Sequence, residues 1–304
     1  MRYIIITTAK NEEKKLPLLA NSLIKQTVLP QIWFILNDGS TDKTEKIIEE
    51  LKLKHEWIYS VNLDESPVDL GIHFSKLLKT ALDHVIKLAK EKNIDYDFLG
   101  KIDADIILPN NLFELIIQRM NQDTKIGIAG PKLDIIPEDN KKIENIDKND
   151  IILEEDDSIL EDPSDAIRLF RKECICDIIG FQVTYAPDMV ICAKAKISGW
   201  KTKRYKDIIA YHCGKTSDTN GLWNGLMFNG FENYYLDISF YIVLIQTVRL
   251  LLKHKHYSSF AFLYGYLVSY FGKREKIEDP ALKNFFENEY PKYIKKVVIS
   301  RVIR

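Results

Sequence analysis

Residues 97–108 read DFLGKIDADIIL, an apolar run of strand character that two carboxylates, Asp103 and Asp105, interrupt. A carboxylate left without a partner in a protein core is strongly unfavourable. In an extended strand, residues two apart point to the same side, so we expect the two aspartates to converge where the strand ends. Converging carboxylates repel each other unless a cation lies beside them, and Mg²⁺ or Mn²⁺ prefers carboxylate together with phosphate oxygens. The stretch therefore indicates a metal that holds a diphosphate, with a helix-capping aspartate as the simpler alternative.

Strands and helices alternate around this segment. The expected strands are residues 3–7, 32–37, 57–63 and 97–108, and the expected helices are residues 11–26, 40–54 and 74–92, with Asn11 and Ser40 as N-caps. Alternation at these lengths predicts an α/β fold with a mostly parallel central sheet and helices on both faces. In such sheets, ligands bind outside the carboxyl ends of the strands, so motifs at those ends carry the most weight.

The second half of the chain is less regular. We expect a helix at 111–120, a strand at 125–133, a charge-rich surface insertion at 137–172 with a short helix at 164–172, a helix ending at Gly199, a strand at 207–214 and a glycine-rich loop at 214–230. Residues 231–304 read as helices with large apolar faces. The interpretation is a first domain over 1–230, with halves at 1–108 and 109–230, followed by a helical extension at 231–304.

Composition is that of an ordinary globular protein. The chain has 304 residues, of which 46% are hydrophobic and 29% charged, and the net charge of −1 argues against nucleic acid as a partner. From Arg249 onward there are twelve Lys/Arg and five Asp/Glu, so a net charge of +7 there leaves −8 on the rest. The four cysteines suit buried positions better than disulfides or zinc. With neither a signal peptide nor a membrane-spanning stretch in evidence, we expect a cytoplasmic protein.

A second motif, NDGSTD at 37–42, lies at the end of the second expected strand. Asp, Gly, Ser and Thr are the natural residues of a turn followed by a helix N-cap, which accounts for part of the motif. Asp38 is at the ligand-facing end of the sheet, where a carboxylate can accept the imide N–H of a uracil or thymine ring.

Four blocks in this order resemble the inverting family 2 glycosyltransferases with the GT-A fold: IITTAKNEE (5–13), NDGSTD (37–42), KIDADIILPNNLFELI (101–116) and PDMVICAKAKISGWK with YHCG (187–214). The resemblance covers roughly residues 1–215 and is specific because the blocks occur together. It implies that 1–230 is the catalytic domain, with 1–108 as its nucleotide-binding half and 109–230 as its acceptor half. It implies a metal-dependent transferase, using Mn²⁺ or Mg²⁺, that moves a sugar from a UDP-, GDP- or TDP-sugar to a hydroxyl or phosphate of a glycan or lipid-linked acceptor.

The resemblance also assigns roles to residues. It implies that Asp38 binds the nucleotide base, that Asp103 lies by the ribose and metal, that Asp105 and His212 bind the metal and that Asp188 is the catalytic base. The remaining nucleotide contacts that it implies are Thr8, Lys10, Glu12 and, on the helix at 74–92, Lys76, with Lys79 as its alternative.

The chain departs from the family pattern at the base. The family has a glutamate immediately before that aspartate, and this chain has Pro187. Glu173 and Asp177 are the next candidates for the base if Asp188 does not serve. A non-catalytic sugar- or nucleotide-binding scaffold is therefore the alternative function. Sugar-phosphate nucleotidyltransferases and dinucleotide oxidoreductases are disfavoured because no glycine-rich loop follows the first strand.

The C-terminal segments at 236–253 and 257–274 are apolar on more than one stripe, yet too short to cross a bilayer. Lys and Arg flank them, a pattern typical of helices that lie on an anionic membrane surface. Packing on the catalytic domain or on a second subunit in a homodimer is the alternative. Membrane binding would favour a lipid-linked acceptor, and the loop at 214–230 is expected to close over the diphosphate.

Overall fold

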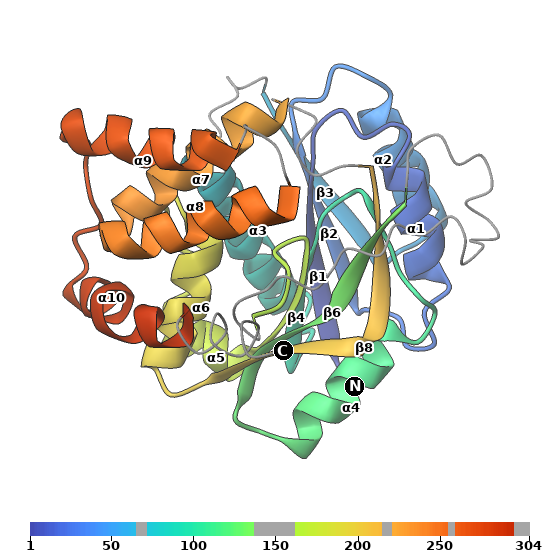
Figure 1. Cartoon of the computed structure of the whole chain (residues 1–304). Coiled ribbons are helices and arrows are strands. Elements are labelled where there is room, and N and C mark those ends of the chain that lie inside the picture. The colour runs from blue at the N-terminus through green and yellow to red at the C-terminus, as the bar shows by residue number, and fades with distance from the viewer. Residues whose placement is uncertain (65–71, 137–161, 215–220, 255–258, 295–304) are drawn as a thin grey trace. The chain divides into compact units, whose positions relative to one another are not determined.

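The structure is a computed structural model that describes residues 1–64, 72–136, 162–214, 221–254 and 259–294 (Figure 1). The chain divides into two compact units, Met1–Gly214 and Lys215–Arg304. The boundary expected near residue 230 falls inside a helix, α7 (Gly221–Tyr235). That helix also replaces the expected glycine-rich loop over its described part, while residues 215–220 of that loop lie outside the described residues.

The first unit is built on a mixed sheet with the strand order β3-β2-β1-β4-β7-β6-β8-β5. The strands are β1 (Tyr3–Ala9), β2 (Ile32–Asp38), β3 (Ile58–Leu63), β4 (Phe98–Ile102), β5 (Ile106–Ile107), β6 (Ile126–Ile136), β7 (Ile167–Arg171) and β8 (Lys201–Cys213). Strands β3, β2, β1 and β4 run parallel, β7 is antiparallel to both β4 and β6, and β6 and β8 are parallel. The expected, mostly parallel sheet is confirmed, with an antiparallel insertion at β7.

Helices cover both faces of this sheet. They are α1 (Leu16–Ile24), α2 (Thr44–Lys54), α3 (Ile72–Glu91), α4 (Leu112–Gln122), α5 (Lys172–Asp177) and α6 (Pro187–Ile197). One core joins α1, α2 and α4 to side chains such as Ile5 and Trp33, and the other joins α3, α5 and α6 to side chains such as Ile4 and Phe34 (Figure 1). Alternate residues of each central strand thus enter opposite cores, which is why these strands read as unbroken apolar runs.

Two helix starts differ from the sequence expectation. Helix α1 begins at Leu16 and α2 at Thr44, and neither has a side-chain cap. Asn11 instead adopts a left-handed backbone conformation with φ of 56°, which asparagine tolerates better than most residues. Asn11 and Ser40, the expected caps, instead connect the two loops that precede these helices, as described for the candidate site.

The charge-rich segment ends in sheet structure. Residues 137–161 lie outside the described residues, and the short helix expected at 164–172 is wrong, because Ile167–Arg171 forms strand β7 between β4 and β6. Four of its five residues are buried. The strand at the end of the unit is longer than expected, since β8 begins at Lys201.

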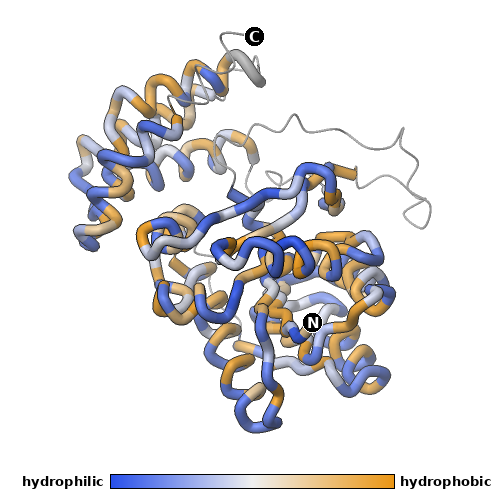
Figure 2. The backbone as a smooth tube through the Cα atoms, turned by 90° about the horizontal axis from the view of Figure 1, so that it is seen from below, coloured by the Kyte–Doolittle hydropathy of each residue, from blue (hydrophilic) through white to orange (hydrophobic). Residues whose placement is uncertain are grey.

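The second unit is helical. Its described elements are α7 (Gly221–Tyr235), α8 (Phe240–His254), α9 (Phe260–Phe271), α10 (Pro280–Asn284) and the π-helix η3 (Phe285–Glu289). Gly230 on α7 faces the carbonyl of Phe262, and Gly265 on α9 faces the carbonyl of Met227, so the two helices cross backbone to backbone. Figure 2 shows hydrophobic residues recurring along these helices between hydrophilic ones. None of the described helices is long and apolar enough to cross a bilayer.

Candidate active site

The carboxyl ends of β1, β2 and β4 meet at one edge of the sheet. These three strands are parallel neighbours, and they end at Ala9, Asp38 and Ile102. Lys10, Asp38 and Asp103 are therefore placed at the same edge by topology alone, as expected for a ligand site of an α/β sheet.

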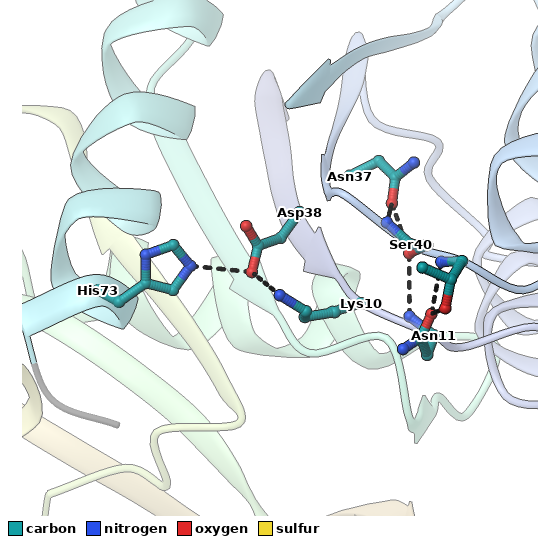
Figure 3. A network of polar contacts seen from close by, with 7 residues as sticks. Lys10, Asn11, Asn37, Asp38, Ser40 and His73 are labelled. Carbon is teal, nitrogen blue, oxygen red and sulfur yellow. Dashed lines mark hydrogen bonds and ion pairs between the residues drawn. The ribbon is translucent and has the colours of Figure 1, made fainter. Parts of the chain in front are cut away.

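Asp38 is almost fully buried and is held by two basic side chains (Figure 3). Its Oδ2 atom lies 3.2 Å from Lys10 Nζ and 2.9 Å from His73 Nε2. Lys10 comes from the end of β1 and His73 from the first turn of α3, so three separate elements build the cluster. The carboxylate is thereby fixed in orientation by partners from two other elements.

The loops after β1 and β2 are tied together beside this cluster (Figure 3). The backbone N–H of Asn11 donates to Ser40 Oγ over 2.9 Å, and Asn11 Oδ1 accepts from the backbone N–H of Thr41 over 2.8 Å. Ser40 Oγ donates to Asn37 Oδ1 over 2.6 Å. Asn11 and Ser40, expected as helix caps, therefore brace the rim of the site.

Asp103 and Asp105 do not lie on an extended strand, contrary to expectation. Strand β4 ends at Ile102, and a turn over Ala104 and Asp105 precedes β5. The two side chains consequently have different partners. Asp103 Oδ1 lies 2.8 Å from Lys101 Nζ, whereas Asp105 Oδ2 lies 3.3 Å from His212 Nε2 and 3.9 Å from Lys15 Nζ.

His212 reaches Asp105 through the sheet. Strand β5 pairs with β8 so that Ile106 is opposite His212, and Cys213 donates its backbone N–H to the carbonyl of Asp105 over 2.9 Å. His212 Nδ1 lies 2.9 Å from the carbonyl oxygen of Gly214, which favours a proton on Nδ1 and leaves Nε2 as the atom that faces Asp105. The two residues that the resemblance implies as metal ligands therefore lie beside each other.

Asp105 and His212 fit a divalent cation. Asp105 Oδ1 is buried and has no hydrogen-bond partner in the structure, which is costly unless a ligand satisfies the oxygen. A carboxylate and an imidazole are donors that Mn²⁺ accepts. No group of three or more His, Cys, Asp or Glu among the described residues is arranged as a complete metal site, so the diphosphate of a substrate would have to supply further oxygens.

Further carboxylates concentrate negative charge at this edge. Burial, together with the charges of Asp105 and Asp103, raises the pKa of Glu12 to about 7. Burial also raises the pKa of Asp103 to about 6, against the opposing effect of Lys101. Such crowding of acids is what a bound cation would relieve.

Asp188 lies in the first turn of α6, immediately after Pro187 at the helix start. Its side chain is hydrogen-bonded to that of Asp165, and its Oδ1 atom lies 3.9 Å from Arg168 Nη1. Burial and the charge of Asp165 raise the pKa of Asp188 well above its usual range. A carboxyl group with a raised pKa suits proton abstraction better than an ordinary surface aspartate.

Three residues of the site were not expected from the sequence: Lys101, His73 and Asp165. Lys101 could have been predicted from the sequence, because a lysine inside the apolar run at 97–108 needs a carboxylate partner. Its buried Nζ contacts Asp103 Oδ1 and lies 3.2 Å from Asp165 Oδ2. His73 and Asp165 carried no such signal, because one opens an ordinary amphipathic helix and the other lies among many acids.

Other candidates lie apart from these contacts. Thr8 is half-buried on β1, and Lys76 is exposed on α3, one turn after His73. Lys79 forms an exposed ion pair with Asp83. The fallback bases Glu173 and Asp177 belong to α5, which follows Arg171, and Arg171 pairs with Phe98 at the opposite end of β4 from Asp103. They are therefore at the wrong edge of the sheet.

The sheet order and this edge define a GT-A type nucleotide-sugar-binding fold, and comparisons with known proteins agree. The model of the family described as glycosyl transferase family 2 matches residues 4–179, more than half of the chain. The chain therefore belongs to glycosyl transferase family 2. No curated protein sequence matches it.

Solved structures share the fold at low identity. S. aureus TarS 1–349 is 16% identical with a TM-score of 0.52, over 98% of this chain and 79% of that one. The mannosyltransferase PcManGT from Pyrobaculum calidifontis, in complex with GDP-Man and Mn²⁺, is 12% identical with a TM-score of 0.53, over 97% of this chain and 84% of that one. The chain spans only 38% of the longer S. aureus TarS structure. These likenesses establish the GT-A fold, as the sequence motifs predicted.

Proposed function

We propose that this glycosyltransferase moves a sugar from a nucleoside-diphosphate sugar to an acceptor hydroxyl with inversion, in a divalent-metal-dependent reaction. The observation that carries the proposal is that separate elements bring Asp38, the Asp103–Asp105 turn with His212, and Asp188 to the sheet edge where α/β folds bind ligands. Structural neighbours solved with UDP-GlcNAc or with GDP-Man and Mn²⁺ support a nucleotide-sugar donor.

Separate groups of residues would hold the base and the diphosphate of the donor. Asp38, fixed by Lys10 and His73, would accept an N–H of the nucleotide base. Thr8, Glu12 and Lys76 remain proposed nucleotide contacts. Asp105 and His212, with Asp103 beside the ribose, would hold Mn²⁺ or Mg²⁺, which when bound neutralises charge on the departing diphosphate.

Asp188 would act on the acceptor. The acceptor oxygen forms a bond to the anomeric carbon while the bond from that carbon to the diphosphate oxygen breaks, and the electron pair stays on the diphosphate. The proton of the acceptor hydroxyl passes to Asp188. A single base and an in-line displacement give inversion of the anomeric centre.

The decisive experiment measures nucleoside-diphosphate release from UDP-, GDP- and TDP-sugars, with Mn²⁺ or with EDTA. We expect one donor to be turned over with Mn²⁺ only, and Asp105→Ala and Asp188→Asn to lose turnover while Asp188→Asn keeps donor affinity. Nucleotide binding without any turnover would instead support the non-catalytic scaffold. Full turnover in EDTA would reject the metal requirement.

We further propose that the second unit binds an anionic membrane surface and that the acceptor is lipid-linked. On α8, Phe240, Leu244 and Val248 are exposed at helical spacing, and on α9 Phe260, Tyr264, Val268 and Phe271 form a similar stripe. Exposed apolar stripes of this kind on two packed helices are unusual in a monomer.

The charges near these stripes favour lipid over another protein surface. Arg249 is on α8, and Lys273 and Arg274 follow α9 after Gly272. Basic residues beside an apolar stripe are typical of helices that lie in the interface of an anionic bilayer. A second copy of the chain in a homodimer is the alternative occupant, and it would be repelled by the same net charge of +7.

A further inference from the structure

A second carboxylate faces the proposed base. Asp165 precedes strand β7, and its side chain is hydrogen-bonded to the carboxyl group of Asp188. Arg168 Nη1 lies 3.9 Å from Oδ1 of both aspartates, and its guanidinium also donates to the backbone oxygens of Pro163 and Asp188. The loop of Asp165 and the start of α6 are thus fastened to one arginine.

Asp165 is fixed from its other side as well. Lys101 Nζ contacts both the side chain of Asp165, at 3.2 Å, and its backbone oxygen, at 2.7 Å. Lys101 and Arg168 lower the pKa of Asp165 well below its usual range, so Asp165 stays ionised when Asp188 becomes protonated. The asymmetry follows from geometry, because Arg168 Nη1 lies 3.9 Å from both carboxylates whereas Lys101 Nζ adds a second cation 3.2 Å from Asp165.

We propose that Asp165 is a positioning residue that accepts the hydrogen bond of Asp188 once Asp188 has taken the acceptor's proton. This rests on the proposed role of Asp188 as base. It also accounts for Pro187, because a carboxylate from the loop before β7 then stands beside the base where the family has a neighbouring glutamate in sequence.

The chemical consequence concerns the strength of the base. The acceptor O–H bond breaks, its proton passes to Asp188, and the resulting carboxylic acid donates to the ionised Asp165. A fixed negative charge beside Asp188 makes it a stronger base and moves its ionisation to higher pH. Around Asp188 the charged groups are Asp165, Arg168 and Lys101, and the two cations alone would act in the opposite direction.

The test is the pH profile of kcat/KM for sugar transfer by Asp165→Asn and, as a second neutral variant, Asp165→Ser. Because Asp188 must be ionised to act, activity rises with pH through its pKa. We expect the acidic limb to move down by about one pH unit or more in both variants and the plateau rate to fall by roughly tenfold. Asp165→Glu, which keeps the charge, should restore the position of the limb.

Asp162→Asn is the matched control, since Asp162 is a nearby carboxylate paired with Lys196 rather than with Asp188. It should leave the limb in place. Donor binding and thermal unfolding of each variant show that the fold is kept. An unshifted limb in the neutral variants, with Asp188→Asn inactive, would overturn the role of Asp165 alone. Normal turnover by Asp188→Asn would overturn the base itself.

Discussion

At the scale of single residues, ion pairs between buried and half-buried side chains hold the site together. Lys101 is the clearest case, because its side chain is only 4% exposed and both Asp103 and Asp165 depend on it. An ion pair of this kind contributes little net stability, yet removal of one partner leaves the others uncompensated. Lys101 therefore matters chiefly because Asp103 and Asp165 are left uncompensated without it.

Replacement of this lysine gives the first prediction. Lys101→Met should lower the free energy of unfolding at pH 7 by about 2–4 kcal/mol, because two half-buried carboxylates lose their buried cation. Lys79→Met is the matched control, since Lys79 forms an exposed pair with Asp83, and it should cost less than about 1 kcal/mol. Urea unfolding measures both, and equal small losses would show that Lys101 is dispensable.

Glu12 gives a prediction with a definite pH dependence. Its folded-state pKa of about 7 exceeds the ordinary value of 4.5, so the native state holds a proton that the unfolded chain releases between these values. Stability should therefore fall as pH rises from about 4.5 to 7. In EDTA, Glu12→Gln should gain stability relative to the parent by up to about 3 kcal/mol at pH 8 and little at pH 4. Thermal unfolding at the two pH values measures this, and a pH-independent difference would contradict it.

At the scale of elements, the sequence predicted the strands and helices of the first half because their apolar patterns reflect burial on two faces. The prediction from sequence failed where residues that usually cap helices make contacts between distant segments instead. Asn11 and Ser40 look like helix caps, but they join two loops at the rim of the site. Strand β7 was missed because its five residues follow a long acidic run that indicates a solvated surface.

In the candidate site too, some residues were predicted from the sequence and others were placed by tertiary contacts. Asp38 and Asp105 were predicted from their place at strand ends and His212 from the family resemblance, and the structure brings Asp105 and His212 together. Asp165 could not have been found, since only the pairing of β4 with β7 brings it beside Lys101, which is distant from it in sequence. The turn at Ala104 was equally hidden, because IDADI alternates as a strand does.

The crossing of α7 and α9 carries a prediction about packing. A Cβ added at Gly265 would lie 1.9 Å from the carbonyl oxygen of Met227, which is backbone that cannot move aside cheaply. Gly265→Ala should therefore destabilise the helical unit by about 1–3 kcal/mol. Gly225→Ala on α7, where nothing lies within 4 Å, should stabilise it by up to about 1 kcal/mol. Limited proteolysis and thermal unfolding compare the two, and equal effects would contradict the close crossing.

At the scale of the whole molecule, charge is divided along the chain. The segment from Arg249 onward carries +7, and the remainder carries −8. Attraction of the basic part to anionic lipid adds about 1 kcal/mol for each Lys or Arg near the surface. The acidic remainder is repelled by the same surface, so the division would orient the molecule on it.

Flotation with lipid vesicles tests this division and the apolar stripes together. The full-length protein should float with vesicles containing anionic lipid, less at high salt and little with neutral lipid, because screening weakens attraction of exposed charges. Phe271→Glu and Val248→Glu place a charge on residues that are 77% and 55% exposed, so they should reduce flotation without unfolding the protein. Leu53→Glu is the matched control, because Leu53 is 87% exposed on α2 of the first unit, and it should float as the parent does. If the parent stays unbound with every vesicle while sedimentation shows a dimer that Phe271→Glu dissociates, the stripes are a subunit interface and the acceptor need not be a lipid.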